Sequence, residues 1–170
     1  EMTWSPDGNF IAYTTKELTG REYALSTNSD VFIYNITTGT RINISEGMKG
    51  YDKNPVYSPD GTKLYASNPG RIYQWSICAG SSTAIAASVH TISASSNWAM
   101  QLAGDGKIYV SRYQQTSLGV INNPNVAGSG CNYSDQGFAL SFGACRLGLP
   151  NYVTSWFMPP PVQFTVTIGT

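Results

Sequence analysis

The stretch "WSPDGNFIAYT", residues 4–14, places a tight-turn tetrapeptide directly before a run of alternating large side chains. In such a turn, proline pre-sets φ, aspartate can cap neighbouring amides, and glycine takes the positive φ that a tight hairpin requires. The strand that follows has a period of two, with Phe10 and Ala12 on one side. Ile11 and Tyr13 lie on the other side, and apolar residues on both sides indicate a strand packed between neighbouring sheets.

This turn and strand recur twice along the chain. "YSPDGTKLYAS" begins at Tyr57 and "LAGDGKIYVSR" at Leu102, and the three lines superimpose on a shared Asp-Gly pair. Ala103 and Gly104 replace the serine and proline in the third copy, so only Asp-Gly is required. The pairs are 53 and 45 residues apart, which is near the length of a four-stranded propeller blade. Blade turns are therefore expected near residues 5–8, 58–61 and 103–106.

The repeats predict an all-β fold with about three to four four-stranded antiparallel sheets, arranged as propeller-type blades. Because closed propellers typically need four to eight blades, we expect an open or partial propeller. The blade repeats are assigned to residues 1–158, with residues 16–29 inserted as a surface hairpin in the first unit. A proline triplet and an alternating run, "VQFTVTI", predict a stiff spacer and a terminal strand in residues 159–170.

The composition excludes several classes of partner. The 170 residues include ten basic and ten acidic side chains, so no net field would attract nucleic acid or an anionic membrane surface. Apolar runs are short, which predicts no membrane-spanning helix. Aromatic residues are abundant and favour strands. The opening residues, "EMTWSPDG", already read as folded-domain sequence, so we expect the natural precursor to extend further upstream.

The charged residues are unevenly distributed along the chain. Residues 1–71 hold fifteen of the twenty, whereas residues 72–170 hold five and are rich in serine, alanine, glycine and asparagine. Such a sharp change in the density of charged residues inside one repeat array suggests that the two parts of the chain have different evolutionary origins.

The first part of the chain contains long and distinctive sequence segments, including "TGREYALSTNSD" and "EGMKGYDKNPV". Residues 1–66 resemble the N-terminal propeller of bacterial dipeptidyl-peptidase-type serine peptidases of the prolyl oligopeptidase family, and their turn motif is shared with TolB-like propellers. The resemblance implies acidic propeller residues that recognise the amino terminus of a peptide. Glu17 and Glu22 lie in the inserted hairpin without the matching Glu-Glu pair, so no site is transferred to this chain.

The second part contains sequence segments of a different kind, including "QLAGDGKIYVSRY", "LGVINNPNVAGSGCNYSD" and "RLGLPNYVTSWF". Residues 70–160 are similar to the propeller-like region of gliding-motility-associated, type-nine-secretion surface proteins of Bacteroidetes. The two resemblances meet within "YSPDGTKLYASNPG", which predicts a junction at residues 66–70. The chain is then either a chimera of two sources or one protein that diverged in both parts.

The sequence contains no constellation for hydrolysis, and we predict that this chain is not itself an enzyme. A serine hydrolase of this kind needs a G-x-S-x-G elbow and a histidine base, and no such elbow is present. The one histidine, His90, reads as an exposed or edge-strand residue.

Neither a metal site nor a cofactor is predicted. The three cysteines and His90 lack zinc-ligand spacing, and Asp105 and Asp135 lack the pattern of a calcium loop. A Cys131–Cys145 bridge in an oxidising compartment is one arrangement of the cysteines. Three free thiols are the other, and the odd number of cysteines favours it.

Aromatic side chains are the best candidates for contacts with a partner, although blade cores use the same residue types. The candidates are Tyr73, Trp75, Trp98, Tyr109, Tyr113 and Trp156. The first functional hypothesis is a protein- or peptide-binding or scaffold module, with glycan as another ligand, of an exported protein in the periplasm or on the surface of a Gram-negative bacterium. The alternative is the accessory, substrate-gating propeller of a serine exopeptidase whose hydrolase domain is absent. Self-association to complete a propeller is a further expectation.

Overall fold

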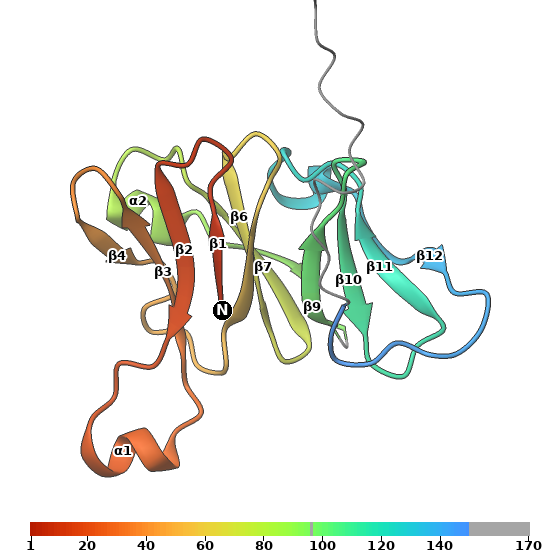
Figure 1. Ribbon diagram of the computed structural model, residues 1–170, viewed down its shortest axis with the longest axis horizontal. Helices are drawn as coiled ribbons and strands as arrows, with labels where there is room; N and C mark the ends of the chain where they lie inside the picture. Colours follow the sequence, from red (N-terminus) through yellow and green to blue (C-terminus); the bar gives the residue numbers. More distant parts are fainter. Residues whose placement is uncertain (96, 150–170) are drawn as a thin grey trace, which may run out of the picture.

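The computed structural model describes residues 1–95 and 97–149, which form three four-stranded antiparallel sheets (Figure 1). In each sheet the spatial order of the strands follows their order in the chain. This arrangement confirms the predicted all-β class and partial propeller. The spacer and terminal strand predicted for residues 159–170 lie outside the described residues, as does Trp156.

The first sheet consists of β1 (Met2–Trp4), β2 (Phe10–Thr15), β3 (Asp30–Asn35) and β4 (Arg41–Asn43). The connection between β2 and β3, expected as a hairpin, contains a short helix, α1 (Gly20–Leu25). This helix projects beyond the end of the sheet and has no buried residue (Figure 1). The insertion therefore adds surface to the first sheet and contributes nothing to its core.

The second sheet consists of β5 (Lys53–Tyr57), β6 (Lys63–Asn68), β7 (Arg71–Ser76) and β8 (His90–Ser93). A second short helix, α2 (Ser82–Ala87), lies between β7 and β8. The hydroxyl of Ser81 accepts a hydrogen bond from the Ala84 amide and caps the helix, and Ile85 is buried. The composition predicts strands throughout, and α2 departs from it because of this local cap and its run of small residues.

The third sheet consists of β9 (Asn97–Leu102), β10 (Ile108–Arg112), β11 (Ser117–Ile121) and β12 (Tyr133–Ala139). A single turn of 3₁₀ helix, Gly128–Cys131, precedes β12. Neither this turn nor the two α-helices, among the described residues, is long and apolar enough to cross a membrane.

The third hairpin turn is one residue shorter than the other two. Trp4 pairs with Ile11 across residues 5–10, and Tyr57 pairs with Leu64 across residues 58–63. In the third sheet Leu102 pairs with Ile108, with only residues 103–107 between them. The ungapped superposition of the third repeat is therefore wrong beyond its Asp-Gly pair. Ile108, rather than Tyr109, corresponds to Leu64.

Two apolar cores lie between the three sheets. β5 lies in the middle of the array and contacts both β1 and β9. The core between the first and second sheets includes Ala12, Val31, Ile33, Leu64 and Trp75. The core between the second and third sheets includes Val56, Tyr65, Ile72, Ile108, Val110 and Ile121. Both faces of the second sheet are thus buried, as the apolar residues on alternate sides of its strands require.

The Ser-Pro-Asp-Gly turns are held by their own side chains. The Ser58 hydroxyl donates to Asp60 Oδ1 at 2.7 Å and accepts from the Lys63 amide at 2.9 Å. Ser5 makes the same two contacts in the first turn, with Asp7 and Phe10. Hydrogen bonds from Ser5 and Asn9 lower the pKa of Asp7, so the carboxylate is stabilised in its charged form. The motif is structural, and Ser5 and Ser58 are engaged as turn caps.

Candidate functional site

The three turns gather at one end of the innermost strands, the upper end of the sheets in Figure 1. Between them lies a groove of about 380 Å³. It is lined by Thr3, Trp4, Pro6, Val56, Tyr57, Pro59, Leu102, Ala103, Gly104 and Gly106. We refer to it as the turn groove.

The prolines of the motif shape the turn groove by packing on the next turn. A Cβ atom added at Gly61 would lie 3.3 Å from Pro6 Cδ, and one added at Gly106 would lie 3.9 Å from Pro59 Cγ. Gly104 stands where the third turn would have its proline, and a Cβ atom there would meet nothing within 4 Å. The groove is therefore open at the third turn.

The lining of the turn groove is mainly apolar. Val56 and Leu102 come from the innermost strands, and Trp4, at the end of β1, is 55% exposed. A concave apolar surface beside an exposed indole suits an apolar side chain of an extended peptide. The Tyr57 hydroxyl is buried without a hydrogen-bond partner among the described residues, and burial raises its pKa well above the ordinary tyrosine value. Tyr57 therefore remains neutral.

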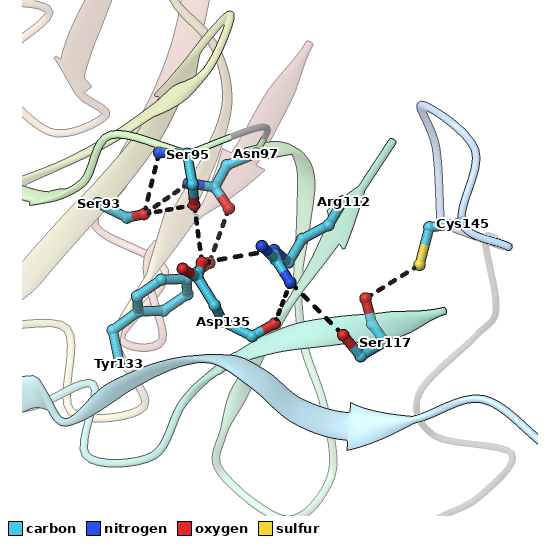
Figure 2. Close-up of polar contacts among 8 residues, drawn as sticks. All are labelled: Ser93, Ser95, Asn97, Arg112, Ser117, Tyr133, Asp135 and Cys145. Atoms are coloured by element: carbon cyan, nitrogen blue, oxygen red, sulfur yellow. Dashed lines mark hydrogen bonds and ion pairs between the residues drawn. The ribbon is translucent and has the colours of Figure 1, made fainter. Parts of the chain in front are cut away.

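A second, polar assembly joins the second sheet to the third (Figure 2). Figure 2 shows its members, Ser93, Ser95, Asn97, Arg112, Ser117, Tyr133, Asp135 and Cys145. Asp135 Oδ1 accepts from the Ser95 hydroxyl at 2.7 Å and lies 2.9 Å from the Tyr133 hydroxyl. That hydroxyl is also 2.7 Å from Asn97 Oδ1, while Asn97 Nδ2 donates to Ser93 at 2.8 Å. The connection between β8 and β9 is thereby tied to β12.

Arg112 lies at the centre of this polar assembly and is 8% exposed. Its Nη1 donates to the Asp135 carbonyl at 2.6 Å and to the Ser117 hydroxyl at 3.4 Å, and its Nε lies 3.4 Å from Asp135 Oδ1. Burial, followed by the bond to Asp135, raises the pKa of Tyr133 well above its ordinary value. Arg112 Nε has no hydrogen-bond partner among the described residues and contacts Asp135 only as an ion pair. The remaining polar groups bond to one another, so the assembly positions strands, and Ser95 donates to a carboxylate instead of to an imidazole base.

Asp52 occupies the position in the second sheet that corresponds to Asn97. Each lies five residues before the last residue of its innermost strand, and each is fully buried. Asp52 Oδ1 accepts from Asn68 Nδ2 at 2.8 Å, but Oδ2 has no hydrogen-bond partner among the described residues. Burial raises the pKa of Asp52, although hydrogen bonds from Asn68 and Ser45 oppose the shift. A buried charge is thus incompletely compensated.

Replacing Asp52 with asparagine, the residue of the third sheet, is expected to stabilise the protein near neutral pH by about 1 kcal/mol. When folding raises the pKa of a carboxyl group, the unfolded chain binds fewer protons than the native protein near that pKa. The free energy of unfolding therefore falls as pH rises through it. The advantage of Asp52→Asn should therefore shrink toward about pH 4, where the unfolded carboxyl protonates. Urea denaturation between about pH 4 and pH 7 measures the difference in stability between the two proteins. Glu46→Gln is the control, because Glu46 is exposed. An advantage that grows on acidification would contradict the argument.

The six aromatic candidates do not form one groove. Tyr73 and Trp75 are buried in the core between the first and second sheets. Trp98 lies on β9 with its ring 5.0 Å from Lys53 Nζ, Tyr109 is on the outer face of the third sheet, and Tyr113 is exposed. The aromatic residues that do line the turn groove are Trp4 and Tyr57, which stand directly before the first and second Ser-Pro-Asp-Gly motifs.

The cysteines and the histidine are also separated. Cys131 is a free thiol in the core between the second and third sheets, and burial raises its pKa. Cys145 is likewise free and donates to the Ser117 carbonyl, so the structure holds these two residues as thiols and not as a disulfide. His90 is the first, exposed residue of β8. Within residues 1–95 and 97–149, no three His, Cys, Asp or Glu side chains gather as metal ligands would.

Sequence reasoning missed both the turn groove and the role of Arg112. The groove could have been found from Pro6 and Pro59, because equivalent prolines in repeated blades face the same end of the array. Arg112 has no such signal, since "YVSRY" reads as an ordinary strand end. Its burial follows from contacts with β12, which is more than twenty residues further along the chain.

Comparison with known proteins connects part of the chain to peptidases. No family model matches it. Dipeptidyl-peptidase 5 of Porphyromonas gingivalis is 56% identical over 64 residues, 38% of this chain, and that of Porphyromonas endodontalis is 56% identical over 61 residues, 36% of the chain. The chain spans 9% of the length of each relative. A segment of the chain is thus homologous to part of dipeptidyl-peptidase 5, which confirms the peptidase resemblance in general form.

Solved structures show the same architecture. A puromycin-hydrolysing peptidase of Mycobacterium tuberculosis superposes on 87% of this chain with a TM-score of 0.54 and 17% sequence identity. The matched part is 23% of that protein. At this level of identity the likeness shows the fold alone, a set of propeller-type blades.

Proposed function

We propose that this chain is a non-catalytic propeller module that binds an extended peptide or a peptide segment of another protein. The observation that carries the proposal is the turn groove, which is concave, apolar and open at Gly104. Few polar groups line it, which favours an apolar peptide side chain over a glycan. Aromatic side chains line grooves that dock extended segments, and the exposed indole of Trp4 gives the turn groove such a surface.

We further propose that the module belongs to an exported protein of a Gram-negative bacterium, located in the periplasm or on the cell surface. The segment homologous to dipeptidyl-peptidase 5 supports this location. The similarity of residues 70–160 to type-nine-secretion surface proteins remains a prediction from the sequence. In that setting the turn groove would recognise a neighbouring protein of the envelope.

A second candidate function is favoured by the homology to dipeptidyl-peptidase 5. On this alternative the blades are the accessory propeller of a serine exopeptidase and guide peptides to a hydrolase domain carried elsewhere in the protein. The full reading frame of the gene distinguishes the two functions. A downstream G-x-S-x-G elbow would support the exopeptidase, and downstream immunoglobulin-like modules with a sorting domain would support the surface protein.

Blocking the turn groove tests the binding function directly. Gly104→Arg would fill the opening without backbone strain, because Gly104 does not have a positive φ and its Cβ direction is free. Gly148→Arg is a matched control, since that glycine has the same two properties and lies outside the groove. The probe is a set of fluorescein-labelled Gly-Ser decapeptides that carry Leu-Pro-Leu, Phe-Pro-Phe or Ser-Pro-Ser at the centre.

We expect fluorescence anisotropy to detect binding of the apolar decapeptides, with the Ser-Pro-Ser probe weaker. Gly104→Arg should raise the dissociation constant at least about tenfold, which corresponds to about 1.4 kcal/mol. Gly148→Arg should leave it unchanged. Equal affinity for the polar and apolar probes, or equal losses in both arginine variants, would reject the turn groove as the binding site.

A further inference from the structure

A hollow distinct from the turn groove lies between the first and second sheets, with a volume of about 280 Å³. Asp7 of the first turn and Asp60 of the second turn both line it, together with Tyr57. Phe10, at the start of β2, and Ile77, which follows β7, add apolar side chains to its lining. We call this hollow the acidic hollow.

The Tyr57 hydroxyl is a buried polar group that lacks a partner in the acidic hollow. Tyr57 is 3% exposed, and its hydroxyl makes no hydrogen bond among the described residues. Burial, followed by the negative charge of Asp7, raises the pKa of Tyr57. Because Asp7 lines the acidic hollow and not the turn groove, this influence places the hydroxyl on the side of the acidic hollow. A ligand that donates a hydrogen bond to it would remove the cost of an unpaired buried hydroxyl.

The two carboxylates give the acidic hollow a negative charge. Neither Asp7 nor Asp60 forms an ion pair within the described part of the chain. The Oδ1 atom of each accepts hydrogen bonds from a serine hydroxyl and a backbone amide of its own turn. Each Oδ2 accepts one hydrogen bond, from Asn9 Nδ2 at 2.8 Å in the first turn and from Thr62 Oγ1 at 2.9 Å in the second. A carboxylate oxygen accepts more than one hydrogen bond, so both Oδ2 atoms retain capacity for a cationic donor.

We propose that the acidic hollow binds an arginine side chain of a peptide segment. A guanidinium group has five N–H donors, enough to serve two carboxylates and a hydroxyl, and it has no acceptor. Its planar face packs on aromatic rings, and its weak hydration suits a hollow lined in part by Phe10 and Ile77. A lysine ammonium is more strongly hydrated and would lose more on entering the same space. A metal ion is disfavoured, because no three His, Cys, Asp or Glu side chains of the described residues gather as ligands.

The acidic hollow and the turn groove are neighbours. Tyr57 lines both, and Pro6 of the turn groove lies close to Gly61 of the acidic hollow, where an added Cβ atom would be 3.3 Å from Pro6 Cδ. The inference rests on the peptide-binding function proposed above for the class of ligand, but it concerns a different hollow. A peptide with an apolar residue near an arginine would place one side chain in each.

Fluorescence anisotropy with the 170-residue chain tests the proposal. The probes are fluorescein-labelled Gly-Ser decapeptides with arginine, lysine or citrulline at the centre. Citrulline is an uncharged analogue of arginine with nearly the same shape, so it isolates the contribution of the charge.

Three variants separate the groups of the acidic hollow. Tyr57→Phe removes only the unpaired hydroxyl, so this variant should fold at least as well as the parent. Asp60→Asn removes a charge and keeps an oxygen that accepts the hydrogen bonds of the turn. Asp105→Asn is the matched control, because it makes the same change in the third Asp-Gly turn, outside the acidic hollow. Circular dichroism checks folding, and mass spectrometry checks that each introduced asparagine remains intact before its glycine.

We expect the arginine probe to bind at least about tenfold more tightly than the citrulline probe, and more tightly than the lysine probe. Tyr57→Phe should raise the dissociation constant of the arginine probe about tenfold, as loss of a hydrogen bond to a charged group does. Asp60→Asn should raise it about threefold at low ionic strength and less in high salt, because Asp60 is exposed. Asp105→Asn should leave it unchanged.

Equal affinity for the arginine and citrulline probes would overturn the proposal, as would an unchanged affinity in Tyr57→Phe or equal losses in Asp60→Asn and Asp105→Asn. Lysine binding as tightly as arginine would overturn the choice of a guanidinium. The Leu-Pro-Leu probe keeps the two hollows apart, since Asp60→Asn should not change its affinity. Failure of the turn groove would appear with the Leu-Pro-Leu probe, and failure of the acidic hollow would appear with the arginine probe.

Discussion

Replacing Trp75 with alanine is expected to lower the free energy of unfolding by about 3–5 kcal/mol, the largest loss from a single substitution that the fold suggests. Trp75 is fully buried between the first and second sheets, where its ring lies 6.0 Å from that of Tyr73. Alanine would leave a cavity that the paired strands on both sides cannot close. Because whole domains are stable by about 5–15 kcal/mol, the variant should be close to unfolding at room temperature.

Urea denaturation followed by far-ultraviolet circular dichroism measures this loss. Phe142→Ala is the control, since Phe142 is 90% exposed and its truncation should change stability by less than about 0.5 kcal/mol. A loss below about 1 kcal/mol for Trp75→Ala would show that the first two sheets do not share the core described above.

Replacing Arg112 with alanine is expected to cost about 2–3 kcal/mol. The substitution removes the donor to the Asp135 carbonyl and leaves the Ser117 and Asp135 side chains without their cation. Because Arg112 is 8% exposed, screening by salt should reduce the loss only slightly. The effect should appear as a lower urea midpoint with an unchanged slope.

Arg41→Ala is the matched comparison for Arg112→Ala. Arg41 forms the other arginine–carboxylate pair among residues 1–95 and 97–149, with Glu17, and the two side chains are 50% and 44% exposed. Exposed pairs contribute about 0–1 kcal/mol, so this variant should lose little and its loss should vanish in high salt. Equal losses at the two positions would mean that the polar assembly of Figure 2 is solvated in solution.

The sequence predicts the blades well because their signal is local. An Asp-Gly turn followed by a period-two strand determines the hairpin, and the structure places β1–β2, β5–β6 and β9–β10 around the three predicted turns. The face assignment of "NFIAYT" is confirmed, with Ala12 buried in the core and Phe10 packed against it.

Register and long-range contacts could not be predicted in the same way. The missing residue in the third turn leaves the Asp-Gly pair intact, so alignment on the motif gives no sign that Tyr109 changes sides. The sequence predicts Tyr73 and Trp75 as contacts with a partner, yet they are cross-strand partners of Ala66 and Leu64 and share their buried face. The alternation of side chains along a strand identifies the two faces of a sheet. It does not indicate which of these faces packs against a neighbouring sheet.

The strand order of the three sheets also bears on how the chain acquires its structure. Within residues 1–95 and 97–149, every strand pairs only with strands adjacent to it in sequence, and the longest connections within a sheet contain the short helices α1 and α2. Closing the loops between strands that are neighbours in sequence costs comparatively little chain entropy, which favours formation of each sheet as a unit. A chain synthesised or translocated from its amino terminus could therefore assemble one sheet at a time, each new sheet using the finished face of the previous one as its template.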